Sequence, residues 1–136
     1  MDELKSLGKV IAPPHSGADA SLLEKIPNPI SKYKKVSFIV SLKGDEFTSV
    51  CPVTGAPDFG RIDINYKPKD WLVESKSLKL YMGSFRMQPT FHEEVVIKVC
   101  RDLADLLEPA YLSVHGVFKS RGGWSIEVEA ETDEDD

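Results

Sequence analysis

Two side chains that could support covalent and acid–base chemistry, Cys51 and Asp58, lie seven residues apart in one Pro- and Gly-containing segment. A thiolate is a nucleophile, and a nearby carboxyl group can accept the thiol proton or later donate a proton to a substrate. Pro52 and Pro57 restrict the backbone of this segment, so both side chains could face one ligand. A lone cysteine is more often a small apolar residue at the base of a loop. The residues alone leave both interpretations of Cys51 open.

The second cysteine, Cys100, has a different setting. It lies on the apolar stripe of a helix predicted from Glu93 to Leu107, where Pro109 ends the pattern. We therefore expect Cys100 to be a core residue. Two cysteines are too few for a disulfide scaffold, so both are expected to be free thiols.

A basic segment, Glu74 to Arg86, opens the other predicted helix, which runs from Glu74 to about Phe85. Lys76 and Lys79 lie three residues apart on one face, and free backbone amides lie at the positive end of the helix dipole. The segment could bind an anion such as a dinucleotide phosphate, or it could be a capped amphipathic helix with a solvated basic face. The sequence lacks a Gly-rich Rossmann motif, so a dinucleotide would have to bind by another geometry.

The three histidines do not predict a metal site. His15, His92 and His115 are scattered, without the paired spacing of metal ligands. Glu93 and Glu94, next to His92, are favoured in the first turn of a helix by the dipole alone.

Hydrophobic alternation predicts strands around the two helices. The expected strands are 36–42, 61–66, 112–118 and 124–128, with a long loop over 44–60 and a turn at 121–123. Two hairpins flanking two helices indicate an α+β fold with a four-stranded antiparallel sheet and both helices on one face. Because such a sheet has two edges, we expect the chain to form a homo-oligomer.

The rest of the sequence indicates where the domain begins and ends and where the protein is located. We expect an irregular N-terminal arm over 1–34, one catalytic domain over 35–130 and a disordered acidic tail over 131–136. Most of the net charge of -5 lies near that tail, so the body gives no reason to expect nucleic-acid binding. The sequence shows no apolar run long enough to span a bilayer and no signal-peptide pattern, so a cytoplasmic protein is expected.

Four motifs together resemble a known family. The segments 47–59, 74–86, 91–93 and 121–123 are similar to the short-chain type of 7-cyano-7-deazaguanine reductase, QueF, the NADPH-dependent nitrile reductase of queuosine biosynthesis. The resemblance runs from about Lys35 to Ile126. It implies a tunnelling fold with the order ββααββ, ring-shaped assemblies, and active sites formed between neighbouring subunits.

The resemblance also implies residue roles. Cys51 would be the covalent nucleophile, forming a thioimide with the nitrile, and Asp58 the proton donor. Residues that would line the substrate pocket are Val73, Glu74, Ser75, His92 and Glu93, with Glu93 the expected anchor for the ring N–H and exocyclic amine of the base. Residues that would contact NADPH are Lys76, Ser77, Lys79, Arg86 and Arg121.

Three other functions are alternatives to nitrile reduction. An amidine-forming relative would share Cys51, Asp58 and the base pocket but lack the cofactor segment. A cyclohydrolase-type enzyme of the same fold would need metal ligands. A non-catalytic binding module would not need Cys51 and Asp58 together.

Overall fold

The computed structural model describes residues 19–30 and 32–132. In chain order the elements are η2 (Ala20–Leu22), β1 (Lys25–Pro27), β2 (Val40–Val50), β3 (Pro57–Lys67), β4 (Trp71–Val73), α1 (Ser75–Gly83), α2 (His92–Leu107), β5 (Tyr111–Arg121) and β6 (Trp124–Glu131). No helix within this described part combines the length and the apolar character that crossing a membrane requires.

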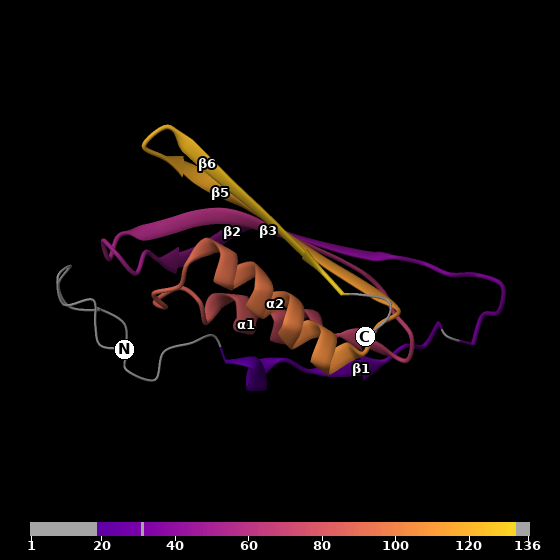
Figure 1. Cartoon of the computed structure of the whole chain (residues 1–136). Coiled ribbons are helices and arrows are strands. Elements are labelled where there is room, and N and C mark those ends of the chain that lie inside the picture. The colour runs from indigo at the N-terminus through magenta and orange to yellow at the C-terminus, as the bar shows by residue number, and fades with distance from the viewer. Residues whose placement is uncertain (1–18, 31, 133–136) are drawn as a thin grey trace.

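The four long strands form one antiparallel sheet in the order β2-β3-β5-β6. Both helices lie on the same face of this sheet (Figure 1). The predicted α+β fold is therefore confirmed. The last hairpin turns where expected, because Gly122 and Gly123 adopt φ values of 63° and 88°, which glycine tolerates without steric cost.

The prediction of a long loop over 44–60 is wrong. Most of it belongs to β2 and β3, and only residues 51–56 connect the two strands. The register shifts between Gly44 and Phe47, so Asp45 and Glu46 form an irregularity that interrupts the alternation. The strand expected from Val36 also begins later, at Val40, and Val36 is 65% exposed.

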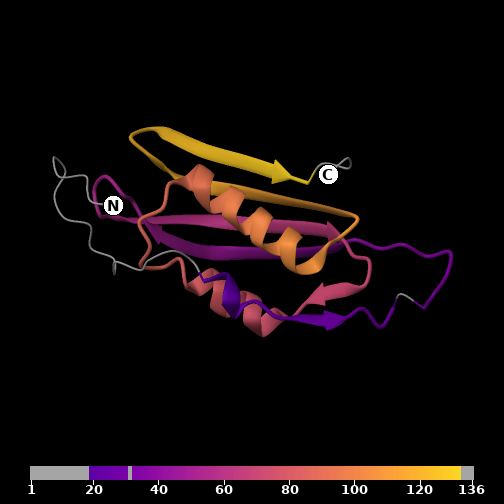
Figure 2. The same cartoon turned by 60° about the horizontal axis from the view of Figure 1, so that its bottom comes forward.

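The predicted ends of the domain also need correction where the structure describes them. β1, within the arm expected to be irregular, pairs with β4, and Figure 2 shows this segment beside α1. At the other end Glu131 pairs with Ser113, so the sheet extends into the predicted tail. Residues 1–18, 31 and 133–136 lie outside the described residues, and the rest of both predictions stays untested.

The core fills the space between the sheet and the two helices. α2 packs against β5 and β6, and its buried stripe includes Cys100, as predicted. The largest fully buried side chains are Tyr66, Tyr81, Phe85, Phe118, Leu103, Leu107 and Leu112.

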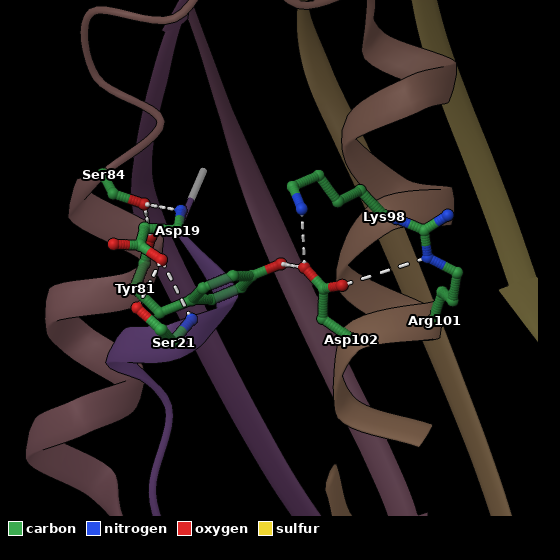
Figure 3. Close-up of polar contacts among 7 residues, drawn as sticks. All are labelled: Asp19, Ser21, Tyr81, Ser84, Lys98, Arg101 and Asp102. Carbon is green, nitrogen blue, oxygen red and sulfur yellow. Dashed lines mark hydrogen bonds and ion pairs between the residues drawn. The ribbon is translucent and has the colours of Figure 1, made fainter. Parts of the chain in front are cut away.

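A polar contact fixes α1 against α2 inside this core. The Tyr81 hydroxyl donates to Asp102 Oδ2 at 2.6 Å, and Lys98 Nζ lies 2.9 Å from the same oxygen (Figure 3). Burial and the neighbouring Asp102 carboxylate raise the pKa of Tyr81, so its hydroxyl stays a donor. The two helices are therefore held by a hydrogen bond to a charged group, which is stronger than one between neutral groups.

Candidate active site

Cys51 follows the last residue of β2 and opens the short connection to β3. Its backbone N–H donates to Ala56 O at 2.8 Å, and Gly55 N–H donates back to Cys51 O at 2.9 Å. The Thr54 hydroxyl accepts from Ala56 N at 3.1 Å. These bonds close a compact turn, so Cys51 is held at a defined place at the end of the sheet.

The surroundings of Cys51 favour its thiolate. Partial burial, the largest single influence, raises the pKa of the thiol. Hydrogen bonds from the Thr54 hydroxyl and from the backbone N–H groups of Thr54 and Val53 together outweigh it, so the pKa lies below its ordinary value. The charge of Asp58 acts in the opposite direction. By contrast, burial raises the pKa of Cys100.

Asp58 is a buried carboxylic acid on the helix-covered face of the sheet. It is 4% exposed and shares its face of β3 with Gly60 and Ile62. Its cross-strand partner in the register is Ser49, two residues before Cys51. Side chains of directly paired residues lie on the same face, so Asp58 and Ser49 are neighbours.

The chain between the two helices brings His92 to this place. Val50 N–H donates to Gln88 O at 2.9 Å, and Thr90 N–H donates to Val50 O at 3.0 Å. The segment is thereby fixed beside the residue that precedes Cys51. α2 begins at His92 directly after it, so the imidazole reaches the end of the sheet that carries Asp58.

His92 and Asp58 are in contact, with 3.3 Å between Nε2 and Oδ2. The contact falls outside hydrogen-bond geometry, so it is an ion-pair distance rather than a formed hydrogen bond. The His92 ring lies parallel to the ring of Phe118, with 4.0 Å between centroids. The structure thus joins two residues, Asp58 and His92, that are 34 positions apart in the sequence.

Two buried polar atoms here have no hydrogen-bond partner in the described part of the chain, Ser49 Oγ and His92 Nε2. Leaving such a group unpaired costs about 1–3 kcal/mol of stability. Buried unpaired groups therefore often mark a functional site or a place where water binds. Both belong to residues beside Asp58. They could pair with a substrate or a water molecule bound there.

The predicted substrate residues are split between two ends of the sheet. Val73 N–H donates to the Tyr66 hydroxyl at 3.2 Å, and Tyr66 lies eight residues along β3 from Asp58. At the rise of a strand, eight residues span about 26 Å, so Val73 and the start of α1 lie far from Cys51 within one chain. Glu93 follows His92 directly, lies at the Cys51 end and is exposed.

Glu74 has a structural role in this chain. Its carboxylate accepts from Ser77 N at 2.7 Å and from Lys76 N at 2.9 Å, which caps α1. These backbone hydrogen bonds lower the pKa of Glu74. A substrate that used this carboxylate would have to share it with the helix cap.

A cavity of about 400 Å³ lies between β2 and α1. Apolar side chains, among them Phe47, Ile62 and Met82, form part of its wall, and Ser75 also lines it. Three cations also line it, namely Lys43, Lys79 and Arg86, together with the acidic residues Asp45 and Glu46. An apolar wall with several cations suits a ligand that has both aromatic rings and phosphates.

The other predicted cofactor residues have different settings. Lys76 is exposed but does not line the cavity. Ser77 is 3% exposed, and its hydroxyl accepts from Glu24 N at 2.9 Å and donates to Glu74 O at 2.8 Å. The structure therefore gives Ser77 an internal role instead of a surface contact. The backbone of Arg121 ends β5, and its side chain lies outside the described residues.

No cluster of three or more His, Cys, Asp or Glu side chains suited to a metal ion occurs in residues 19–30 and 32–132. The sequence interpretation missed Ser49, Thr54, Lys43 and Phe118. The alternation of Phe47 and Ser49 before Cys51 was an available signal, because it places Ser49 on the buried face. The contribution of Phe118 had no local signal, since it depends on strand pairing.

Comparison with known proteins gives consistent matches. A family model described as QueF-like protein matches residues 57–136. A protein of Caulobacter vibrioides (strain NA1000 / CB15N), named NADPH-dependent 7-cyano-7-deazaguanine reductase, is 46% identical over 122 residues, which cover 90% of this chain and 78% of that protein. A Helicobacter pylori (strain Shi470) protein of the same name is 49% identical over 124 residues, covering 91% and 82%. The crystal structure of the archaeosine synthase QueF-Like in the apo form aligns with a TM-score of 0.66 at 26% identity, covering 72% of this chain and 96% of that one.

Proposed function

The chain belongs to the QueF-like protein family, and from this premise we propose that it is an NADPH-dependent 7-cyano-7-deazaguanine reductase. It would convert the nitrile to the 7-aminomethyl group in the synthesis of queuosine. The observation that carries the proposal is the meeting of Cys51, Asp58 and His92 at one end of the sheet, with the pKa of the Cys51 thiol lowered. That arrangement combines a nucleophile with buried groups that can exchange protons.

In the first proposed step the Cys51 thiolate adds to the nitrile carbon. The C≡N bond becomes C=N, and its nitrogen takes up one proton, so a neutral thioimide forms on Cys51. Asp58 is the proposed proton donor, with His92 at 3.3 Å able to return the proton to it. The Thr54 hydroxyl stabilises the thiolate before attack and again when Cys51 departs.

NADPH, when bound, supplies a hydride at each of two reductions. After the first, the C–S bond breaks, Cys51 leaves as a thiolate and an imine remains. Protons for the amine nitrogen come from the buried pair Asp58 and His92. Because Asp58 is 4% exposed, these protons are exchanged away from bulk water.

The groove between β2 and α1 fits the proposed cofactor. Lys79 and Arg86 would bind the phosphates, with Lys43 as a third cation that the sequence did not indicate. The apolar wall would take a ring of the dinucleotide. Lys76, on the exposed surface of α1, would contribute long-range attraction for the anion.

Separation of the predicted substrate residues supports a shared site between subunits. Glu93 and His92 lie with Cys51, whereas Val73 and Ser75 lie at the far end of the sheet in the same chain. A neighbouring subunit could bring its own Val73 and Ser75 to this Cys51. The edge strands β2 and β6 offer surfaces for such an assembly, and Trp124 on β6 is 79% exposed.

An amidine-forming activity is the second candidate, because the structural neighbour is an archaeosine synthase. It would use the same thioimide but no hydride. The cations of the cavity and the relatives' names, at 46% and 49% identity, favour the reductase.

The test is oxidation of NADPH in the presence of 7-cyano-7-deazaguanine. Wild type should oxidise two NADPH for each amine formed, and without NADPH its mass should increase by that of the intact nitrile. Cys51→Ala should lose both effects, whereas Cys100→Ala should keep them and lose about 1 kcal/mol of stability. Adduct formation without NADPH oxidation would favour the amidine-forming candidate. Full activity of Cys51→Ala would overturn the covalent mechanism.

A further inference from the structure

The imidazole of His92 is held by an aromatic surface. Its ring plane is 1° from that of Phe118, with 4.0 Å between the centroids. Phe118 is 1% exposed, and the His92 side chain is 12% exposed. Since His92 Nε2 has no hydrogen-bond partner in the described part of the chain, that nitrogen does not fix the orientation of the ring.

Two glycines leave the space that the Phe118 ring occupies. Gly60 is its cross-strand partner, and a Cβ there would lie 2.9 Å from Phe118 Cδ1 and 2.7 Å from Val117 O. A Cβ on Gly116 would lie 2.7 Å from Val96 Cγ2 and 2.9 Å and 3.0 Å from two atoms of the Phe118 ring. Any side chain at either position would displace the ring, so these glycines let Phe118 lie close to the sheet.

A third contact stabilises this position from the side. Phe47, on β2, meets Phe118 edge to face, with 6.2 Å between centroids and 79° between planes. Aromatic pairs of this geometry contribute stability beyond the area that they bury. The Phe118 ring is therefore confined from beneath and from one edge, and its free face is the one on which His92 lies.

From these contacts we propose that Phe118 is a positioning residue, which sets the plane of His92 so that Nε2 faces the Asp58 carboxylate. The inference rests on the proposed function and goes beyond it, since it gives Phe118 a role that acts through His92. A flat aromatic face also attracts a protonated imidazole. Phe118 can therefore hold the His92 ring in both its neutral and its protonated form. Gly60 and Gly116 contribute to this positioning, because they make room for the Phe118 ring.

The test compares Phe118→Leu with Phe85→Leu, which removes another fully buried aromatic ring, one that packs on Phe47 and Tyr81. Both variants should lower the melting temperature by a similar amount. Phe118→Leu should reduce kcat about tenfold or more, because acid–base groups contribute 10²–10⁴-fold and lose part of that when misaligned. Its KM for NADPH should stay within about twofold, and Phe85→Leu should change kcat by less than about threefold. Equal losses of kcat in the two variants would show that Phe118 only supports the core.

A double-mutant comparison separates positioning from a direct effect. In a His92→Asn background, Phe118→Leu should reduce kcat by no more than about twofold, because the residue through which Phe118 acts is already gone. The same factor in both backgrounds would overturn the inference.

One measurement does not need turnover. In wild type the ring protons of His92 should be shifted upfield by the Phe118 ring current in NMR spectra. The shift should disappear in Phe118→Leu and persist in Phe85→Leu. An unshifted His92 in wild type would overturn the inference, whereas a wild type that shows the shift but cannot reduce the nitrile would count against the proposed function alone.

Discussion

His92 Nε2 lies 3.3 Å from Asp58 Oδ2, and both side chains are largely buried where β2 ends and β3 begins. The contact falls outside hydrogen-bond geometry and is an ion-pair distance. The two residues reach each other because residues 88–90 bond to Val50 before α2 begins.

Removing either partner should impair proton transfer. We expect His92→Asn to lower kcat about 10- to 100-fold and Asp58→Asn to slow both covalent capture of the nitrile and the later reduction, because Asp58 is the proposed proton donor. His115→Asn is the matched control, because His115 pairs with Glu127 elsewhere on the sheet. Rapid-quench product analysis with intact-protein mass distinguishes these outcomes. A fully active Asp58→Asn variant would assign proton donation to another group.

Reactivity of Cys51 should extend to lower pH than that of an ordinary thiol. Because the folded protein lowers the pKa of Cys51, the thiolate fraction reaches one half at a lower pH, and alkylation by iodoacetamide should follow it. Thr54→Val removes a hydrogen bond that lowers this pKa, so the profile should move to higher pH. Alkylation rates across pH 5–9, read by mass at Cys51, provide the test. A profile unchanged by Thr54→Val would exclude the hydroxyl as the stabilising group.

Lys79 should matter more for cofactor binding than Lys76. Lys79 lines the cavity, so Lys79→Ala should raise KM for NADPH about tenfold, the effect of losing one charge-assisted contact. Lys76→Ala should have a smaller effect that fades at high salt. Lys69→Ala, on an exposed loop, serves as the control. Thioimide formation should survive in each variant, and equal effects of Lys76 and Lys69 would remove Lys76 from the cofactor site.

Subunits with different defects should restore activity in each other. Cys51→Ala lacks the nucleophile, and Ser75→Phe places a bulky group at the exposed start of α1, where a neighbour's substrate would bind. If the site forms between subunits, mixing the two inactive variants after mild dissociation should give activity of roughly a quarter of wild type, because some interfaces combine both intact halves. Absence of any recovery in verified hetero-oligomers would place the whole site in one chain.

The contact between Tyr81 and Asp102 should contribute to stability without affecting chemistry. Tyr81→Phe removes a 2.6 Å hydrogen bond to a buried carboxylate, so we expect a loss of about 1.5–3 kcal/mol in the free energy of unfolding. Urea denaturation measures it, with kcat expected to change little. Tyr111→Phe, whose hydroxyl bonds to Glu131 at the surface, should cost much less.

The sequence by itself determined the class of fold and supplied the candidate reactive groups. The apolar stripe around Cys100 predicted its burial, and the alternation in 61–66 and 112–118 placed two central strands, because local periodicity reports which face is covered. The bulge at Asp45 and Glu46 interrupts that periodicity. The sequence therefore predicted a loop where the structure has part of a β-hairpin.

Only the tertiary structure decided which groups meet. Strand pairing places Ser49 beside Asp58 and Gly60 beneath Phe118, and the bridge from Val50 to Pro89 brings His92 to them. It also separates Val73 from Cys51 by most of a strand, although both belong to the predicted site. Periodicity in a sequence reports the direction of each side chain from its own element. The distance between side chains on different elements depends on register and packing, which long-range contacts set.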